Sequence, residues 1–147
     1  MKSPSDQELR AAITGADSPS WSVRAAAGRC LAAAPQIKAV ADVLHRLLLD
    51  TQDTGVTSDT AIALLARRDL PGLRAVLAAR AQASDSGTAD QLAAELDGDP
   101  RWVTHDGHAE LIQQLQALTS DTDPEIRDEA QRRISLLRGS NDLPPAG

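Results

Sequence analysis

The residues best suited to chemistry lie between His105 and Glu110, where two histidines and two carboxylates fall within six residues. Imidazole and carboxylate groups are ligands that transition metals use in proteins. The two histidines are three residues apart across a predicted helix start, however, and no third histidine lies nearby. The simpler explanation of the two carboxylates is that Asp106 is an N-cap and Glu110 a first-turn acid, because helix N-termini favour such groups. We expect no metal, and we keep an enzyme or a ligand- or metal-binding subunit using His105–Glu110 and the 98–107 loop as the alternative.

Other signatures of catalysis are absent from the sequence. It contains no Gly-rich phosphate loop, no Gly-x-Ser-x-Gly elbow and no Cys-x-x-Cys pair. The single cysteine, Cys30, lies in an apolar helical pattern and is interpreted as a small buried hydrophobe rather than a nucleophile. One cysteine permits no disulfide within the chain, which favours a reducing compartment. We therefore expect a non-enzymatic protein without a cofactor.

The composition favours an all-α fold. The chain has 147 residues and no Phe or Tyr, and Trp21 and Trp102 are its only aromatic residues. The core must then be made of Ala, Leu, Val and Ile, whereas sheets usually use aromatic and β-branched residues. The N-terminus is polar, and no apolar run approaches the roughly 20 residues of a membrane span. We expect a cytoplasmic protein with no membrane contact.

The charge is unevenly distributed along the chain. The net charge is −6, and residues 85–129 hold twelve acidic side chains against two basic ones, Arg101 and Arg127. A field of this sign repels phosphate backbones and attracts basic proteins. The simpler interpretation is that these acids decorate solvated helix faces and helix N-termini. We expect a basic protein partner and no nucleic acid.

Helix start and stop signals recur along the whole chain. The predicted helices cover about 6–14, 21–34, 36–50, 57–68, 70–83, 88–97, 108–119 and 124–138. In the fourth helix Ile62 and Leu65 are expected to face inward, and Trp21 is expected to be part of the core. We predict a single helical-repeat domain over 1–138, and a flexible C-terminal tail over 139–147 that begins where Gly139 ends the last helix.

The helices follow a repeat that is clearest in the second helix of each pair. Two aligned series can be written, Val23, Val56, Thr88, Ile126 and Leu31, Leu64, Leu96, Ile134. Both series advance by 33, 32 and 38 residues. The longer last step indicates an insertion, which matches the irregular segment 98–107.

The stretch Asp121-Thr-Asp-Pro-Glu-Ile-Arg127, echoed by the turn that leads to Arg24, resembles HEAT repeats and the related armadillo-like α-solenoids. The resemblance implies a right-handed α-α superhelix of about eight helices in four repeats. It also implies that Asp121, Arg127 and Arg24 belong to a structural ladder between neighbouring repeats. Independently, an arginine near the start of a second helix can reach the turn carbonyls or the acid six residues back. The middle repeats depart from the pattern, since Thr57 stands where the second repeat would have arginine.

These features predict a protein-binding α-solenoid, such as an adaptor or an inhibitor of the immunity-protein type. Its concave helix face would present the polar residues Arg29, Asp59, Asp90, Asp128 and Arg132 to the partner. The acids Asp97, Asp99 and Asp106 would steer a basic partner toward it. Trp102 either pins the 98–107 loop or serves as an exposed anchor, and we select it as the best single candidate for partner contact.

Overall fold

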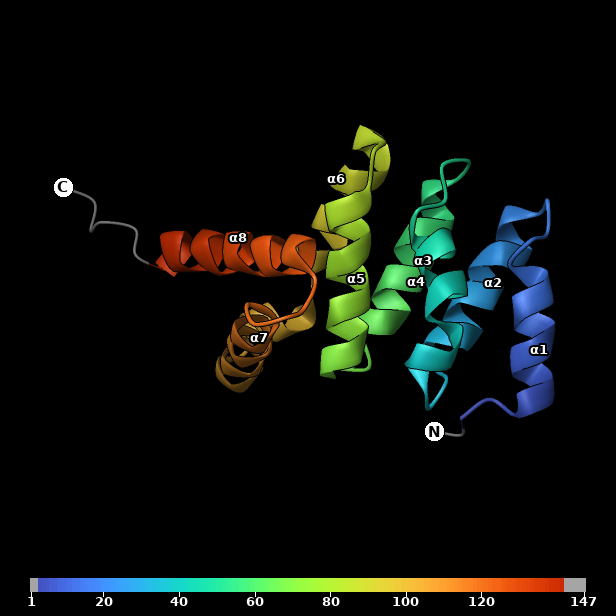
Figure 1. The fold of residues 1–147 in the computed structure, drawn as a ribbon, viewed down its shortest axis with the longest axis horizontal. Coiled ribbons are helices and arrows are strands. Elements are labelled where there is room, and N and C mark those ends of the chain that lie inside the picture. Colours follow the sequence, from blue (N-terminus) through green and yellow to red (C-terminus); the bar gives the residue numbers. More distant parts are fainter. Residues whose placement is uncertain (1–2, 142–147) are drawn as a thin grey trace. The chain divides into compact units, whose positions relative to one another are not determined.

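The computed structural model describes residues 3–141, which form eight α-helices and two short 3-10 helices and contain no strand (Figure 1). The helices are α1 (Asp6–Gly15), α2 (Trp21–Ala32), α3 (Ala41–Leu48), α4 (Thr54–Leu65), α5 (Leu70–Gln82), α6 (Ser86–Asp97), α7 (His105–Leu118) and α8 (Pro124–Asn141), with η1 (Ile37–Val40) before α3 and η2 (Pro100–Val103) before α7. The all-α prediction is therefore confirmed for these residues. None of the described helices has both the length and the apolar character needed to cross a membrane.

The chain divides into two compact units, which we call unit 1 and unit 2. Unit 1 ends at Asp99 and unit 2 begins at Pro100. This boundary falls inside segment 98–107, which the sequence marks as an insertion. The single domain over 1–138 stays a prediction, and residues 142–147 of the predicted tail lie outside the described residues.

Unit 1 is built from three helix hairpins, in which α1 packs against α2, α3 against α4, and α5 against α6. The second helices of the hairpins also pack side by side, α2 on α4 and α4 on α6. The core is aliphatic, and its fully buried side chains include Leu31, Leu44, Leu64, Leu77 and Leu92. Burying one leucine in this way stabilises the fold by about 2 kcal/mol before entropy is counted.

Unit 2 consists of η2, α7 and α8, with α7 in contact with both of the others. One apolar stripe of α7 and the core positions of α8 are buried; these residues are Leu111, Leu115, Leu118, Ile126 and Ala130. Their helical spacing places each set on one face, because side chains three and four residues apart share a face of an α-helix.

The second helices begin with the spacing that the sequence predicts. Their first residues are Trp21, Thr54, Ser86 and Pro124, which advance by 33, 32 and 38. Aspartates cap three of them, since side-chain oxygens of Asp53, Asp85 and Asp123 accept backbone N–H groups of the first turn. Ser20 stands at the same position of α2 without such a bond. The aligned residues Leu31, Leu64, Leu96 and Ile134 are all buried.

Several predicted helix limits are wrong. The helix expected over 36–50 is two segments, η1 and α3, because Val40 has φ −120° and ψ 15°, outside the helical region. Helix α7 begins earlier than expected, because Thr104 is its N-cap and accepts the N–H of Gly107 at 3.0 Å. Asp106 is therefore a first-turn residue and not the N-cap. Helix α8 continues past Gly139, since one helical glycine costs only about 1 kcal/mol relative to alanine.

Two apolar side chains predicted for the core, Ile62 and Trp21, point to solvent instead, as does Val23 of the first aligned series. Ile62 and Trp21 are each 52% exposed, and Val23 is 43% exposed. Helix α4 carries apolar residues all around its circumference, so its neighbours decide which side remains uncovered. Trp21 lies beside the first turn of α4, where Gly55 offers no side chain to cover the indole.

Candidate functional site

The turns that lead into α2 and α8 are held by arginines in the same way. Arg24 Nη1 donates to the carbonyl oxygen of Ser18, and Arg127 Nη1 donates to that of Asp121, both at 2.9 Å. The acceptor lies six residues before the arginine in each case, as the sequence predicts for the turn carbonyls. The Asp121 carboxylate accepts the N–H of Asp123 at 2.9 Å and so shapes the turn itself.

Arg24 also forms a buried ion pair that connects two hairpins. Its Nε donates to Oδ2 of Asp50 at 2.8 Å, and both side chains are almost fully buried. The other oxygen of Asp50 accepts the N–H groups of Gln52 and Asp53 at 3.0 and 2.9 Å, which fixes the turn before α4. The pair links two neighbouring hairpins through an acid, Asp50, that was not predicted, and the ladder of Asp121, Arg127 and Arg24 stays a prediction.

Arg67 is a second link that sequence reasoning missed. It follows α4, and its Nη1 donates to the carbonyl oxygens of Ala32 and Ala34 at 2.8 and 2.7 Å. Its Nε also donates to the carboxylate of Asp69, the N-cap of α5. One guanidinium therefore satisfies carbonyls at the C-terminal end of α2 while holding the start of α5. The sequence shows only an arginine near a helix end, and this does not specify which backbone carbonyls the guanidinium reaches.

The exposed side of α2, α4 and α6 is connected by polar contacts between neighbouring helices. Arg29 on α2 pairs with Asp59 on α4 at 2.7 Å. Ser58 on α4 donates to Glu95 on α6 at 2.9 Å, and Gln91 donates to the same oxygen at 2.9 Å. We call this surface the second-helix face. It brings together the predicted residues Arg29 and Asp59, while Asp90 lies exposed elsewhere on α6.

The first part of unit 2 is organised around Arg101. This residue of η2 is only 4% exposed, and its Nη1 donates to Glu110 Oε1 at 3.2 Å and to Gln114 Oε1 at 2.9 Å. Glu110, interpreted from the sequence as a first-turn acid, therefore neutralises a buried guanidinium. These contacts attach η2 to α7.

Trp102 and His108 form the ring contact of this region. The two rings meet edge to face with centroids 5.5 Å apart, and Trp102 is half-buried. The contact fits a side chain that pins η2 onto α7. His105, the first residue of α7, is exposed. Nowhere in residues 3–141 do three or more His, Cys, Asp or Glu side chains lie close enough together to hold a metal ion.

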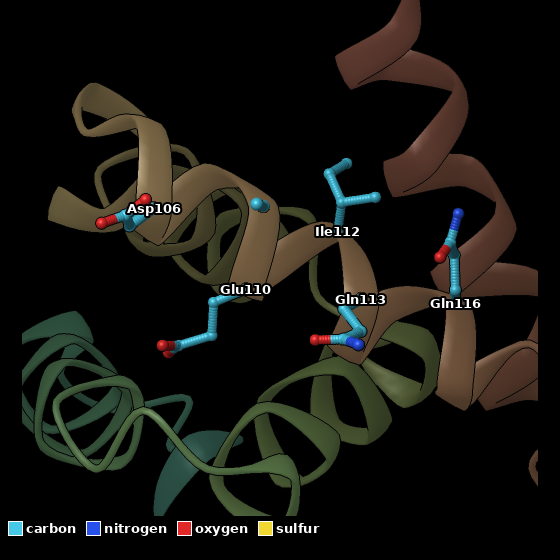
Figure 2. A pocket seen from close by; sticks show the side chains of 6 residues that line it. Asp106, Glu110, Ile112, Gln113 and Gln116 are labelled. Carbon is cyan, nitrogen blue, oxygen red and sulfur yellow. The ribbon is translucent and has the colours of Figure 1, made fainter.

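One side of α7 forms an open hollow, shown in Figure 2. Its lining residues are Asp106, Ala109, Glu110, Ile112, Gln113 and Gln116. The side chains of Glu110 and Gln113 project from the same side of the helix. These groups can accept hydrogen bonds and attract a cation.

The remaining residues predicted for partner contact differ in exposure. Asp97, Asp106, Asp128 and Arg132 are exposed. Asp99 is buried, with 5% exposure, which does not fit a contact on the surface. The exposed negative charge predicted for partner contact therefore comes from the other aspartates.

Cys30 is a poor nucleophile in this setting. Burial raises the pKa of its thiol, and the nearby Glu8 carboxylate raises it further. The sulfur lies 3.8 Å from the backbone carbonyl oxygen of Glu8, to which the thiol can donate. The protonated form is therefore favoured, and a protonated thiol neither attacks carbonyl carbons nor binds metal ions as a thiolate does.

No protein-family model, curated protein or solved structure matches the chain. The resemblance to HEAT repeats therefore depends on the quoted residues and their spacing.

Proposed function

We propose that this chain is a non-enzymatic, protein-binding α-solenoid of the cytoplasm, acting as an adaptor or as an inhibitor of the immunity-protein type. In this proposal its hairpins form a HEAT-like, right-handed superhelix with the second helices on the concave side. The partner is a basic protein, which the acidic part of the chain attracts.

The observation that carries the proposal is the side-by-side packing of α2, α4 and α6. This arrangement exposes the second-helix face as one surface across three helices, and that surface is connected by the Arg29–Asp59 and Ser58–Glu95 contacts. A surface held in place by bonds between its own side chains loses little entropy when a partner binds. Binding, and not chemistry, is the role such a surface supports.

The charge supports a basic partner. Within 85–129 the two basic residues are engaged with the protein itself, Arg101 with side chains and Arg127 with backbone carbonyls. The carboxylates of Asp97, Asp106 and Asp128 are exposed and add negative charge to the field around the chain. Such a field acts chiefly on the association rate. Trp102, which lies within the same stretch of sequence, remains a proposed contact.

The test is the rate at which the chain associates with a partner purified with it from the native host. Asp106→Lys should slow association about fivefold at low salt, and the rate of the unchanged chain should fall as salt rises. Asp42→Lys is the matched control, because Asp42 is also an exposed second residue of its helix. Equal rates for the two variants, or association that ignores salt, would refute acidic steering.

A further inference from the structure

The second-helix face has a centre line that runs along α4. In an α-helix each residue turns by about 100°, so Gly55 and Ile62, seven apart, lie almost directly in line. Asp59 and Ser58 then flank this line on opposite sides, toward α2 and α6 respectively, as their bonds to Arg29 and Glu95 confirm. The centre line is therefore bordered by polar contacts on both sides.

Two apolar groups lie on this centre line. The first is the side chain of Ile62, which is half exposed. It lies one helical turn after the polar residues Ser58 and Asp59. At the other position the Trp21 ring extends from α2, and a methyl group added to Gly55 would lie 3.7 Å from it. Seven residues of helix separate the two positions, which is about 10.5 Å.

The charge around the two apolar groups is negative. Asp59 on one border is balanced by Arg29, and the carboxylate of Glu95 on the other border adds one net negative charge. An amphipathic helix that presents apolar residues at positions i and i+7 matches the spacing of Trp21 and Ile62. Lysine or arginine between those positions would lie beside the carboxylates.

We propose that the second-helix face binds a basic amphipathic helix of the partner, with Trp21 and Ile62 as its two apolar anchors. This inference deepens the proposed function, because it names the segment that the basic partner supplies. Aromatic side chains that are partly exposed on a rigid surface are the usual centres of binding energy. Neither anchor was predicted from the sequence, which placed both inside.

A synthetic peptide is the probe for this inference. It is an 18-residue helix with leucines at i and i+7 and lysines between them, and its control is a scrambled peptide of the same composition. Trp102→Phe leaves Trp21 as the only tryptophan of the full chain, so that fluorescence reports on this residue alone. Peptide binding should shift the Trp21 emission to shorter wavelength and reduce its quenching by acrylamide.

Ile62→Ala in the same background should weaken peptide binding about tenfold, the loss expected for an interface anchor. Val103→Ala is the matched control, because Val103 is an apolar residue of unit 2 that is 86% exposed. Circular dichroism checks that both variants keep their helices. An unchanged Trp21 emission, equal affinity for the scrambled peptide, or an Ile62→Ala affinity equal to the control would each overturn the inference. Because acidic steering is tested with the native partner, these results would leave the proposed function standing.

Discussion

Gly28 marks the closest approach between α2 and α4, and replacing it tests that packing directly. A β-carbon added at Gly28 would overlap Oγ1 of Thr60 and would lie 3.1 Å from its Cβ and 3.3 Å from its Cγ2. Rotation of the Thr60 side chain moves the hydroxyl away but leaves the two β-carbons too close. Because Thr60 is fully buried on α4, the two helices themselves must separate.

Two opposing terms set the size of the effect. Alanine is about 1 kcal/mol better than glycine inside a helix, whereas overpacking a core costs about 1–3 kcal/mol. We expect Gly28→Ala to lower the free energy of unfolding by about 1 kcal/mol, despite the better helix propensity. Thr60→Ala in the same chain removes Oγ1 and Cγ2, so the double variant should be less destabilised than the sum of the two single changes by about 1 kcal/mol.

The assay is urea unfolding followed by far-UV circular dichroism, with stability taken from the midpoint at constant slope. Gly15→Ala is the control, because an added β-carbon there would meet the Val23 side chain at an ordinary 3.4 Å. That variant should be neutral or slightly stabilised. If Gly28→Ala proves as stable as Gly15→Ala, or if the double variant is simply additive, the packing of α2 on α4 described above is wrong.

Two further predictions concern the same unit. Arg24→Met should lower the free energy of unfolding by about 3 kcal/mol, because Asp50 would be left charged and buried. Arg29→Ala breaks an exposed ion pair and should lower it by less than about 1 kcal/mol in the same urea assay. Equal losses would contradict the burial of the Arg24 pair. Cys30 has a thiol pKa above its ordinary value in the folded chain, so its stabilising contribution is complete below the unfolded pKa of about 8.5 and is lost as pH rises through the folded pKa. Melting temperatures measured from about pH 8 to about pH 10 should fall less for Cys30→Ser than for the unchanged chain. If the melting temperatures of both proteins fall equally with pH, the raised pKa of the Cys30 thiol is refuted.

The sequence by itself determined where most helices lie and which of their leucines share one face. These properties are local, since the capping aspartates act within one turn and the stripe Leu111, Leu115 and Leu118 is a matter of helical spacing. The steps of 33, 32 and 38 between second helices follow from the same local signals. Arg24 and Arg127 also make a local contact, because each reaches a backbone carbonyl only six residues back, in the loop that precedes its own helix.

Only the tertiary structure decided which groups meet across helices and which apolar side chains stay outside. The acid nearest to Arg24 in the sequence is Asp17, yet the packing of one hairpin on the next selects Asp50, 26 residues away. Apolar residues occur around the whole circumference of α4, and the packing of α2 and α6 decides that the side with Ile62 stays uncovered. The reason is physical: spacing along one helix fixes directions about its own axis, whereas burial depends on neighbours that the chain brings from elsewhere.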